Sequence, residues 1–226
     1  MGRTKLFAII MVMLAIAGGL LCYREANRQE GADVRETEVK IGDIISFGEN
    51  QWRVLDVQNG KALILSEKVI EKRMYHEKNE DITWERCTLR KYLNEEYLNS
   101  FSAEERSRIA ETTIVNNDNP WFSTIGGNAT KDKVFLLSLE EVIKYFGDSG
   151  QLNNKNPNSK YFINDQYNYV RIAKDAKGEE CWWWLRSPGY YGNLAAYVHD
   201  FGRVHVDGSD VHFGAGGVRP ALWLNL

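Results

Sequence analysis

The residues most able to bind a ligand lie close together near the end of the sequence, where three of the four His residues fall. Tyr gives a large contact area for few rotatable bonds, while Asn, Ser, Asp and His give adaptable hydrogen bonds, a mixture typical of binding loops. The sequence therefore predicts a ligand-binding surface, and the alternative is an ordinary solvated hairpin. The predicted binding residues are Tyr190, Tyr191, Asn193, Tyr197, His199, His205, Asp207, Ser209, Asp210 and His212, with Asp200 in the same stretch.

A two-residue turn at Gly208-Ser209 predicts how these residues are arranged. The predicted cross-strand pairs are Asp207–Asp210, Val206–Val211, His205–His212 and Val204–Phe213. Successive residues of a strand take opposite faces, so one face is apolar and the other is rich in His. His205 and His212 with Asp207 could hold a transition metal. Spaced surface His residues usually have no such role, and we predict no metal and no cofactor.

Composition excludes several classes of protein. Lys and Arg total 28 and Asp and Glu total 31, giving a net charge of −3 and no basic field for a nucleic acid. Hydrophobic residues make up 43% of the chain, enough for a core, and three Cys are too few for a disulfide scaffold. The sequence contains no phosphate loop, dinucleotide fingerprint or nucleophile–base pair. Residues 117–120 offer oxygen ligands for calcium, but they lie far from the late cluster in the sequence.

The N-terminus carries an uncharged apolar run over residues 6–23. At about 1.5 Å per residue its length is close to the ~30 Å hydrocarbon core of a bilayer. The alternatives are a signal peptide cleaved near Ala17 and a lipoprotein modified at Cys22. We expect an uncleaved anchor, with residues 1–5 as a cytoplasmic tip and 24–38 as a stalk. The expected localisation is a single-pass cell-membrane protein whose C-terminal domain is extracellular.

Residues 39–226 are predicted to form one α+β domain of short antiparallel strands with two or three helices. The predicted strands lie near residues 44–47, 52–57 and 62–65, with a hairpin turn at Asn59-Gly60. Apolar residues at helical spacing predict a helix over 88–98, and capping boxes that begin at Ser102 and Ser138 predict two more.

Two motifs rich in Trp, Arg and Pro, at residues 182–189 and 217–223, predict a rigid frame on either side of the late cluster. Arg186 and Arg219 flank prolines, and a planar guanidinium there can tie loop carbonyls or a carboxylate together. The predicted structural residues are Trp84, Arg90, Trp183, Arg186 and Arg219. For Cys87 and Cys181 the sequence leaves open a disulfide or two buried free thiols.

The motifs Trp182–Gly189 and Gly217–Leu222, together with Asp132–Glu141, resemble those of a bacterial domain-of-unknown-function family with W-W-L-R-S-P-G and terminal G-V-R-P-A-L. The resemblance extends over residues 39–226. That family is similar to C-type-lectin-like folds of the formylglycine-generating-enzyme type. The resemblance implies a single C-type-lectin-like domain with its variable positions in the late region. Formylglycine chemistry uses a pair of late cysteines, whereas this sequence has only Cys181 there.

The expected function is a non-catalytic, receptor-like or adhesin-like domain that binds an extracellular protein or glycan. It would be held at the membrane by its N-terminal helix and would bind no nucleic acid. The alternatives are an enzyme of the formylglycine-generating-enzyme-like fold and a structural protein of the cell envelope.

Overall fold

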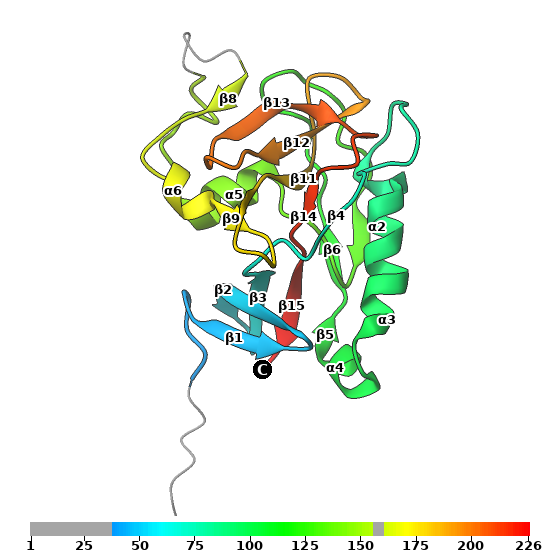
Figure 1. Ribbon diagram of the computed structural model, residues 1–226, viewed down its shortest axis with the longest axis vertical. Helices are drawn as coiled ribbons and strands as arrows, with labels where there is room; N and C mark the ends of the chain where they lie inside the picture. Colours follow the sequence, from blue (N-terminus) through cyan, green and yellow to red (C-terminus); the bar gives the residue numbers. More distant parts are fainter. Residues whose placement is uncertain (1–37, 156–160) are drawn as a thin grey trace, which may run out of the picture. The chain divides into compact units, whose positions relative to one another are not determined.

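Short strands dominate the computed structural model of this protein, which describes residues 38–155 and 161–226. Val39–Leu226 forms one compact unit. Its strands belong mainly to a five-stranded and a six-stranded sheet, and Figure 1 shows the six-stranded sheet above the five-stranded one.

The five-stranded sheet combines early strands with the C-terminal strand. In spatial order it consists of β1 (Ile44–Phe47), β2 (Asn50–Gln58), β3 (Lys61–Ser66), β15 (Ala221–Asn225) and β5 (Ile109–Ala110). The predicted turn joins β2 to β3, and Asn59 and Gly60 have φ of 52° and 70°, as a type I′ turn requires. The three strands predicted in this region are confirmed.

The six-stranded sheet carries the late part of the chain. In spatial order it consists of β4 (Glu71–Lys72), β14 (Gly217–Val218), β11 (Trp183–Pro188), β12 (Leu194–Val198), β13 (Val204–Asp210) and β8 (Phe162–Ile163). Every residue of β11 is buried, so this strand lies at the centre of the unit. Two further pairs of strands are β6 (Thr112–Ile114) with β7 (Thr130–Asp132), and β9 (Ala173–Lys174) with β10 (Glu180–Cys181).

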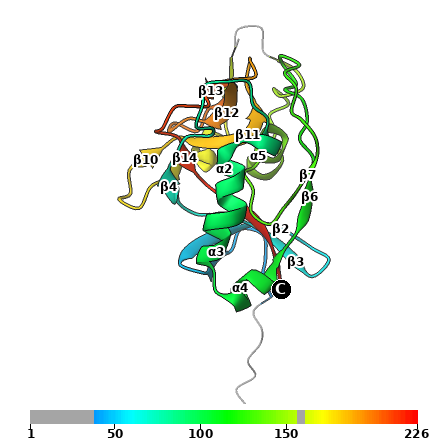
Figure 2. The ribbon, with the colours of Figure 1, turned by 90° about the vertical axis from the view of Figure 1, so that its right-hand side faces the viewer.

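Helices are short and cover the sides of the sheets. They are η1 (Trp84–Arg86), α2 (Thr88–Tyr92), η2 (Leu93–Tyr97), α3 (Leu98–Ser100), α4 (Ala103–Arg108), α5 (Leu139–Phe146) and α6 (Asn168–Arg171). Figure 2 shows α2 and α3 running down one side of the unit. Both predicted capping boxes are confirmed, because Ser102 and Ser138 each accept a hydrogen bond from the backbone N–H three residues later.

The predicted helix over 88–98 is interrupted by a π-helical turn, η2. Asn94 lies in this turn, and its Nδ2 donates to the carbonyls of Arg90 (3.1 Å) and Val134 (2.8 Å). Its Oδ1 accepts from the backbone N–H of Lys133 at 2.8 Å. The side chain of Asn94 thus bonds a carbonyl of the preceding helical turn, and π-helical turns occur where a side chain enters the helix hydrogen bonds in this way.

The predicted α+β class is wrong. Strands hold 33% of the described residues and helices only 18%, so the described part of the chain is mostly β. Several strands, such as β4, β9 and β14, contain two residues each. Such strands are too short to give an alternating pattern, and they form only because neighbouring strands offer backbone partners.

The predicted membrane-spanning helix and single-pass membrane localisation are corrected as well. Residues 1–37, which include the predicted tip and span and nearly all of the stalk, lie outside the described residues. In the described ranges, no helix is both long and apolar enough to cross a bilayer. The Thr88–Ser100 stretch falls short of the ~20 apolar residues that a span needs.

Candidate functional site

The late hairpin folds at a different place from the one predicted. β12 and β13 pair as Tyr197↔His205 and Val198↔Val204, so the chain turns over residues 199–203. The backbone N–H of His199 donates to the carbonyl of Arg203 at 2.8 Å and closes this turn. The predicted turn at Gly208-Ser209 and the pairs built on it are therefore wrong.

Gly208 has a different role from the one predicted. Its φ is +83°, and a Cβ there would lie 2.7 Å from the carbonyl oxygen of Ala195. The register of β12 and β13 shifts beside it, between Ala195 and Tyr197. Glycine at this position thus permits a bulge within the continuous strand β13. The bulge needs a positive φ, which a hairpin turn at Gly208 would also have needed.

The predicted alternation along β13 is confirmed. Val204 and Val206 are fully buried, whereas His205 and Asp207 are only half-buried on the opposite face. Phe213 is 52% exposed and lies in the loop after β13, so it does not share the buried face as predicted. β12 and β13 therefore present one face to the core and a polar, aromatic face outward.

Five side-chain rings form a continuous row on this outer face, and we call them the ring row. Its members are Phe162, His205, Tyr197, Trp182 and Phe213. The centroid separations along the row are 5.2, 4.6, 5.1 and 6.0 Å. Consecutive members come from β8, β13, β12, the residue before β11 and the loop after β13. Rings at such separations attract one another, so the row is a preformed surface.

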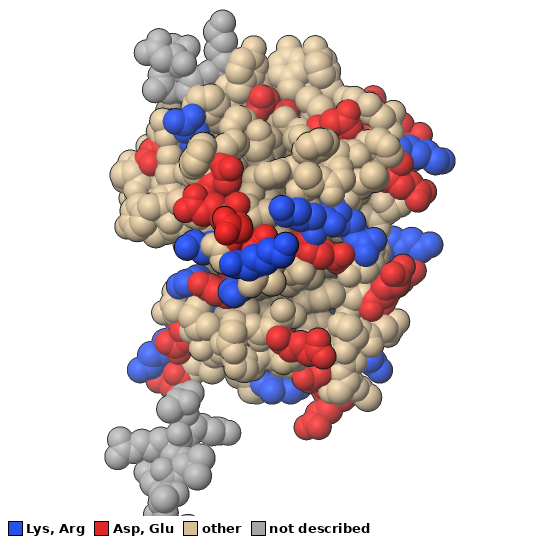
Figure 3. All heavy atoms as spheres, in the orientation of Figure 1, with Lys and Arg blue, Asp and Glu red and all other residues tan. Residues whose placement is uncertain are grey.

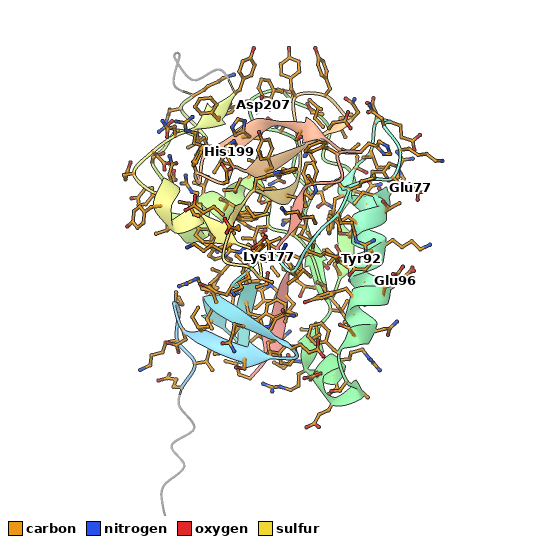
Figure 4. The ribbon with its side chains drawn as sticks, viewed as in Figure 1. Glu77, Tyr92, Glu96, Lys177, His199 and Asp207 are labelled. Carbon is orange, nitrogen blue, oxygen red and sulfur yellow. The ribbon has the colours of Figure 1, made fainter. Side chains whose placement is uncertain are left out.

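Two carboxylates border the ring row. Asp207 Oδ1 lies 3.1 Å from Nδ1 of His205, and a carboxylate oxygen of Asp200 lies against Nδ1 of His199. The His199 ring is 5.6 Å from the His205 ring. Burial and, to a smaller extent, the negative charges of Asp207 and Asp200 together raise the pKa of Tyr197 to about 12. In Figure 4, Asp207 and His199 both lie in the part of the unit formed by β12 and β13.

Tyr190 and Tyr191 form a second aromatic group next to the row. Their rings are 4.4 Å apart, and Phe122 lies 4.5 Å from Tyr190. The side chains remain 41% and 62% exposed. The backbone N–H of Tyr190 donates to the carbonyl of Asp207 at 2.7 Å, so the segment that carries this pair is hydrogen-bonded to β13.

The remaining predicted residues point elsewhere. Asn193 Nδ2 donates to Asn79 Oδ1, and Asn79 Nδ2 donates to Asp210 Oδ2, both at 3.0 Å. The backbone N–H of His212 donates to Asp210 at 2.8 Å. These residues fasten the end of β13 to the loop that holds Asn79, while Ser209 pairs with Ala195. They are not brought together with the ring row.

Neither metal interpretation is supported. Among the residues that the structure describes, no group of three His, Cys, Asp or Glu could hold a metal ion. In the stretch 117–120, Asn119 Oδ1 accepts from the backbone N–H groups of Trp121 and Phe122. Asp118 Oδ1 accepts from Gly126 at 2.9 Å, so these oxygens are engaged in loop structure.

Trp84 and Arg90, both predicted to be structural, converge on the buried carboxylate of Asp132. Trp84 Nε1 donates to Asp132 Oδ2 at 2.9 Å, and Arg90 Nε donates to Oδ1 at 2.7 Å. Trp84 is buried, and Asp132 is only 1% exposed. One carboxylate on β7 thus ties η1 and α2 together.

The other predicted structural residues lie in the core around β11. Trp183 Nε1 donates to the carbonyl of Arg171 at 3.1 Å. Arg186 forms an ion pair with Glu141 and donates to the carbonyl of Leu136 at 2.7 Å. Arg219 Nε donates to the carbonyl of Ser66 at 2.9 Å, and its guanidinium lies 5.0 Å from the Trp183 ring. Burial lowers the pKa of Arg219 to about 10, although the carboxylate of Glu67 opposes the shift.

Phe122, Phe162 and Trp182 contribute rings that we did not select from the sequence. Phe162 lies on β8 and Phe122 in a long loop, so nothing in their spacing links them to residues 190–212. Trp182 belongs to the Trp motif and contacts both Trp184 (4.7 Å) and Tyr197 (5.1 Å). Alternation along the motif predicts that Trp182 and Trp184 lie on the face opposite Trp183, but it does not link that face to residues 190–212.

Surface charge is unevenly distributed over the unit. Figure 3 shows Lys and Arg gathered in a band across the middle of one face, with acidic residues among them. The upper part of this face, over β12 and β13, is mostly uncharged and carries a few scattered charged residues of both signs. Elsewhere, a groove of about 580 Å³ lined by residues that include Glu77, Tyr92 and Glu96 lies beside α2 (Figure 4).

A family model described as "Domain of unknown function (DUF6273)" matches residues 59–226. No curated protein and no solved structure matches the chain. The expected likeness to C-type-lectin-like folds therefore stays a prediction. Since the match spans most of the chain, the protein belongs to the DUF6273 family of domains of unknown function.

Proposed function

We propose that this protein is a non-catalytic binding protein that recognises a macromolecular ligand through the ring row and the adjacent Tyr190–Tyr191 pair. The observation that carries the proposal is the row itself, in which segments separate in sequence supply five rings to one face. Contiguous apolar surface that remains accessible on a protein commonly marks an interaction site.

The frame beneath the row supports this role. The opposite face of β13 is fixed by buried Val204 and Val206, and β11 is buried along its whole length. A rigid support lowers the entropy lost on binding, and Tyr and Trp are enriched among the residues that dominate binding energy. Ring–ring contacts hold the row in place before any ligand arrives.

The state of the cysteines argues against the alternative of a cysteine-based enzyme. Cys87 and Cys181 are both buried and unpaired. Burial raises the pKa of Cys87 to about 12, and it also raises the pKa of Cys181. A thiol is nucleophilic only as the thiolate, so neither group is activated near neutral pH.

The proposal is tested by screening the full-length chain against arrays of glycans and of purified proteins, and then comparing variants against each ligand recovered. Phe213→Ser and Tyr197→Ser remove ring-row members, and each should weaken binding about tenfold or more, as hot-spot residues do. Tyr169→Ser is the matched control, because Tyr169 is an exposed tyrosine on α6. Thermal unfolding identifies a variant that has lost its fold.

If the ring-row variants bind every recovered ligand as tightly as the parent does, the row is not the binding surface. A double variant, Tyr190→Ala with Tyr191→Ala, then tests the Tyr190–Tyr191 pair independently of the ring row. A loss confined to this pair would place the site beside the row instead of on it.

A further inference from the structure

We propose that the ligand of the ring row is an arginine-containing segment of a partner protein, whose guanidinium groups lie against the rings and bind Asp200 and Asp207. The inference rests on the proposed function and names the class of ligand that the same surface takes. Its basis is the charge around the row.

Both acidic residues at the row have His as their only ion-pair partners among the described side chains. Asp207 Oδ1 contacts Nδ1 of His205 at 3.1 Å, and Asp200 contacts Nδ1 of His199. A His ring carries a positive charge only when it is protonated. Two carboxylates therefore stand beside the rings without a permanent positive charge bonded to either.

The negative charges of Asp200 and Asp207 both act on the hydroxyl group of Tyr197. Tyr197 is in the middle of the ring row, between Trp182 and His205. Burial is the main reason that the pKa of Tyr197 rises to about 12, and the charges of Asp207 and Asp200 both contribute to this rise. A negative field that resists ionisation of a phenol attracts a cation to the same position.

One end of the row already holds a guanidinium group. Arg203, in the turn between β12 and β13, places its guanidinium carbon 5.3 Å from the centre of the Phe162 ring. This is within the range of a cation–π contact. The chain's own arginine thus illustrates the kind of contact that we propose for the partner's arginines along the rest of the row.

Guanidinium fits this combination of groups better than the other common ligand groups. It is planar, weakly hydrated and always charged, it stacks on aromatic rings, and it donates two parallel hydrogen bonds to a carboxylate. An anionic ligand would meet Asp200 and Asp207 as like charges. A neutral glycan could contact the rings, but it would gain no electrostatic binding energy from the charges of Asp200 and Asp207.

The probe is a fluorescent peptide of alternating arginine and glycine, and the reference is the same peptide with citrulline in place of each arginine. Citrulline keeps the shape of arginine but carries no charge. Fluorescence anisotropy with the full-length chain measures both affinities, at low and at moderate salt. We expect the arginine peptide to bind at least tenfold more tightly than the citrulline peptide, and added salt to reduce the difference.

Asp200→Asn combined with Asp207→Asn should weaken binding of the arginine peptide at least tenfold, because the amides keep the shape of the site without its charge. Glu104→Gln combined with Glu111→Gln is the matched control. It also removes two negative charges, from exposed residues on α4 and between β5 and β6, outside the six-stranded sheet. Near-ultraviolet circular dichroism checks that the aromatic environment of the row is unchanged.

Equal binding of the two peptides, or an unaffected Asp200→Asn/Asp207→Asn variant, would overturn the inference. Binding of neutral oligosaccharides through the ring row without binding of the arginine peptide would also overturn it, while leaving the proposed function intact. If Phe213→Ser changes the affinity for no array ligand and for neither peptide, both the inference and the proposed function fail.

Discussion

The two faces of the six-stranded sheet use the same kinds of residue for different purposes. Against the inner side, Asp165 in the loop after β8 and Arg171 of α6, whose carbonyl accepts from Trp183 of β11, form an ion pair of 2.9 Å with side chains 1% and 0% exposed. On the outer side, Asp207 and His205 are 3.1 Å apart with side chains 28% and 18% exposed. The inner carboxylate is matched by a permanent cation, whereas the outer one is matched by a titratable ring. The inner pair is thus suited to holding the fold and the outer pair to receiving a ligand.

Further hydrogen bonds tie the inner pair to the surrounding segments. Arg171 also donates to the carbonyl of Gly147 at 2.9 Å, and Asp165 accepts from Ser149 and from the backbone N–H of Tyr167. Burial alone would raise the pKa of Asp165, but these hydrogen bonds and the Arg171 charge together hold it below the usual value. Such a pair is costly to break, because removal of one partner leaves the other charge buried without a counter-charge and without water.

The largest effect is expected from Asp165→Asn, which leaves Arg171 buried without a counter-charge. We expect the free energy of unfolding to fall by about 3–5 kcal/mol, measured by urea denaturation. The matched comparison is Asp165→Asn with Arg171→Met, which removes both charges. The double variant should lose less stability than the single one, and an equal or greater loss would show that the charges do not act as a pair.

The pH dependence of this pair gives an independent readout. Because the pKa of Asp165 is lowered in the folded protein, its contribution to stability is complete above the unfolded value near ~3.9 and is lost as the pH falls through the folded value. The difference in stability between the parent and Asp165→Asn should therefore shrink below about pH 4. A difference that stays constant into acid would exclude ionisation of Asp165 as its source.

A smaller but still large effect is expected from Arg219→Ala. This change removes hydrogen bonds to the carbonyls of Ser66 and Glu67 and the contact with Trp183, and it should lower the free energy of unfolding by about 2–4 kcal/mol. Arg53→Ala is the control, because its ion pair with Glu67 is partly exposed and should contribute about 0–1 kcal/mol. A thermal midpoint unchanged in Arg219→Ala would contradict the structural role assigned to this residue.

The smallest effect is expected on the outer face. Asp207→Asn keeps an oxygen beside His205 and should change the free energy of unfolding by about 0.5 kcal/mol or less. Urea denaturation of this variant beside Asp165→Asn tests the contrast between the two faces directly. A loss comparable to that of Asp165→Asn would mean that the outer face also holds the fold together.

The difference between the two faces also explains which parts of the site were predictable. Composition indicated Tyr197, His199, His205 and Asp207, and alternation gave the correct faces for Val204–Asp207. The turn was misplaced because Gly208 can serve equally in a hairpin and in a bulge, and only pairing with Ala195 decides between them. Asn193, Asp210 and His212 have binding-loop chemistry but are directed toward the loop that holds Asn79.

The sequence by itself determined the local features of this protein. The Asn59-Gly60 turn, the two capping boxes and the β13 alternation depend on residues within a few positions of one another, where backbone preference and side-chain spacing act directly. Only the tertiary structure decided the balance of strand over helix and the composition of the ring row. Two-residue strands and the meeting of Phe162, Tyr197 and Phe213 depend on partners distant in sequence, and no local pattern records such contacts.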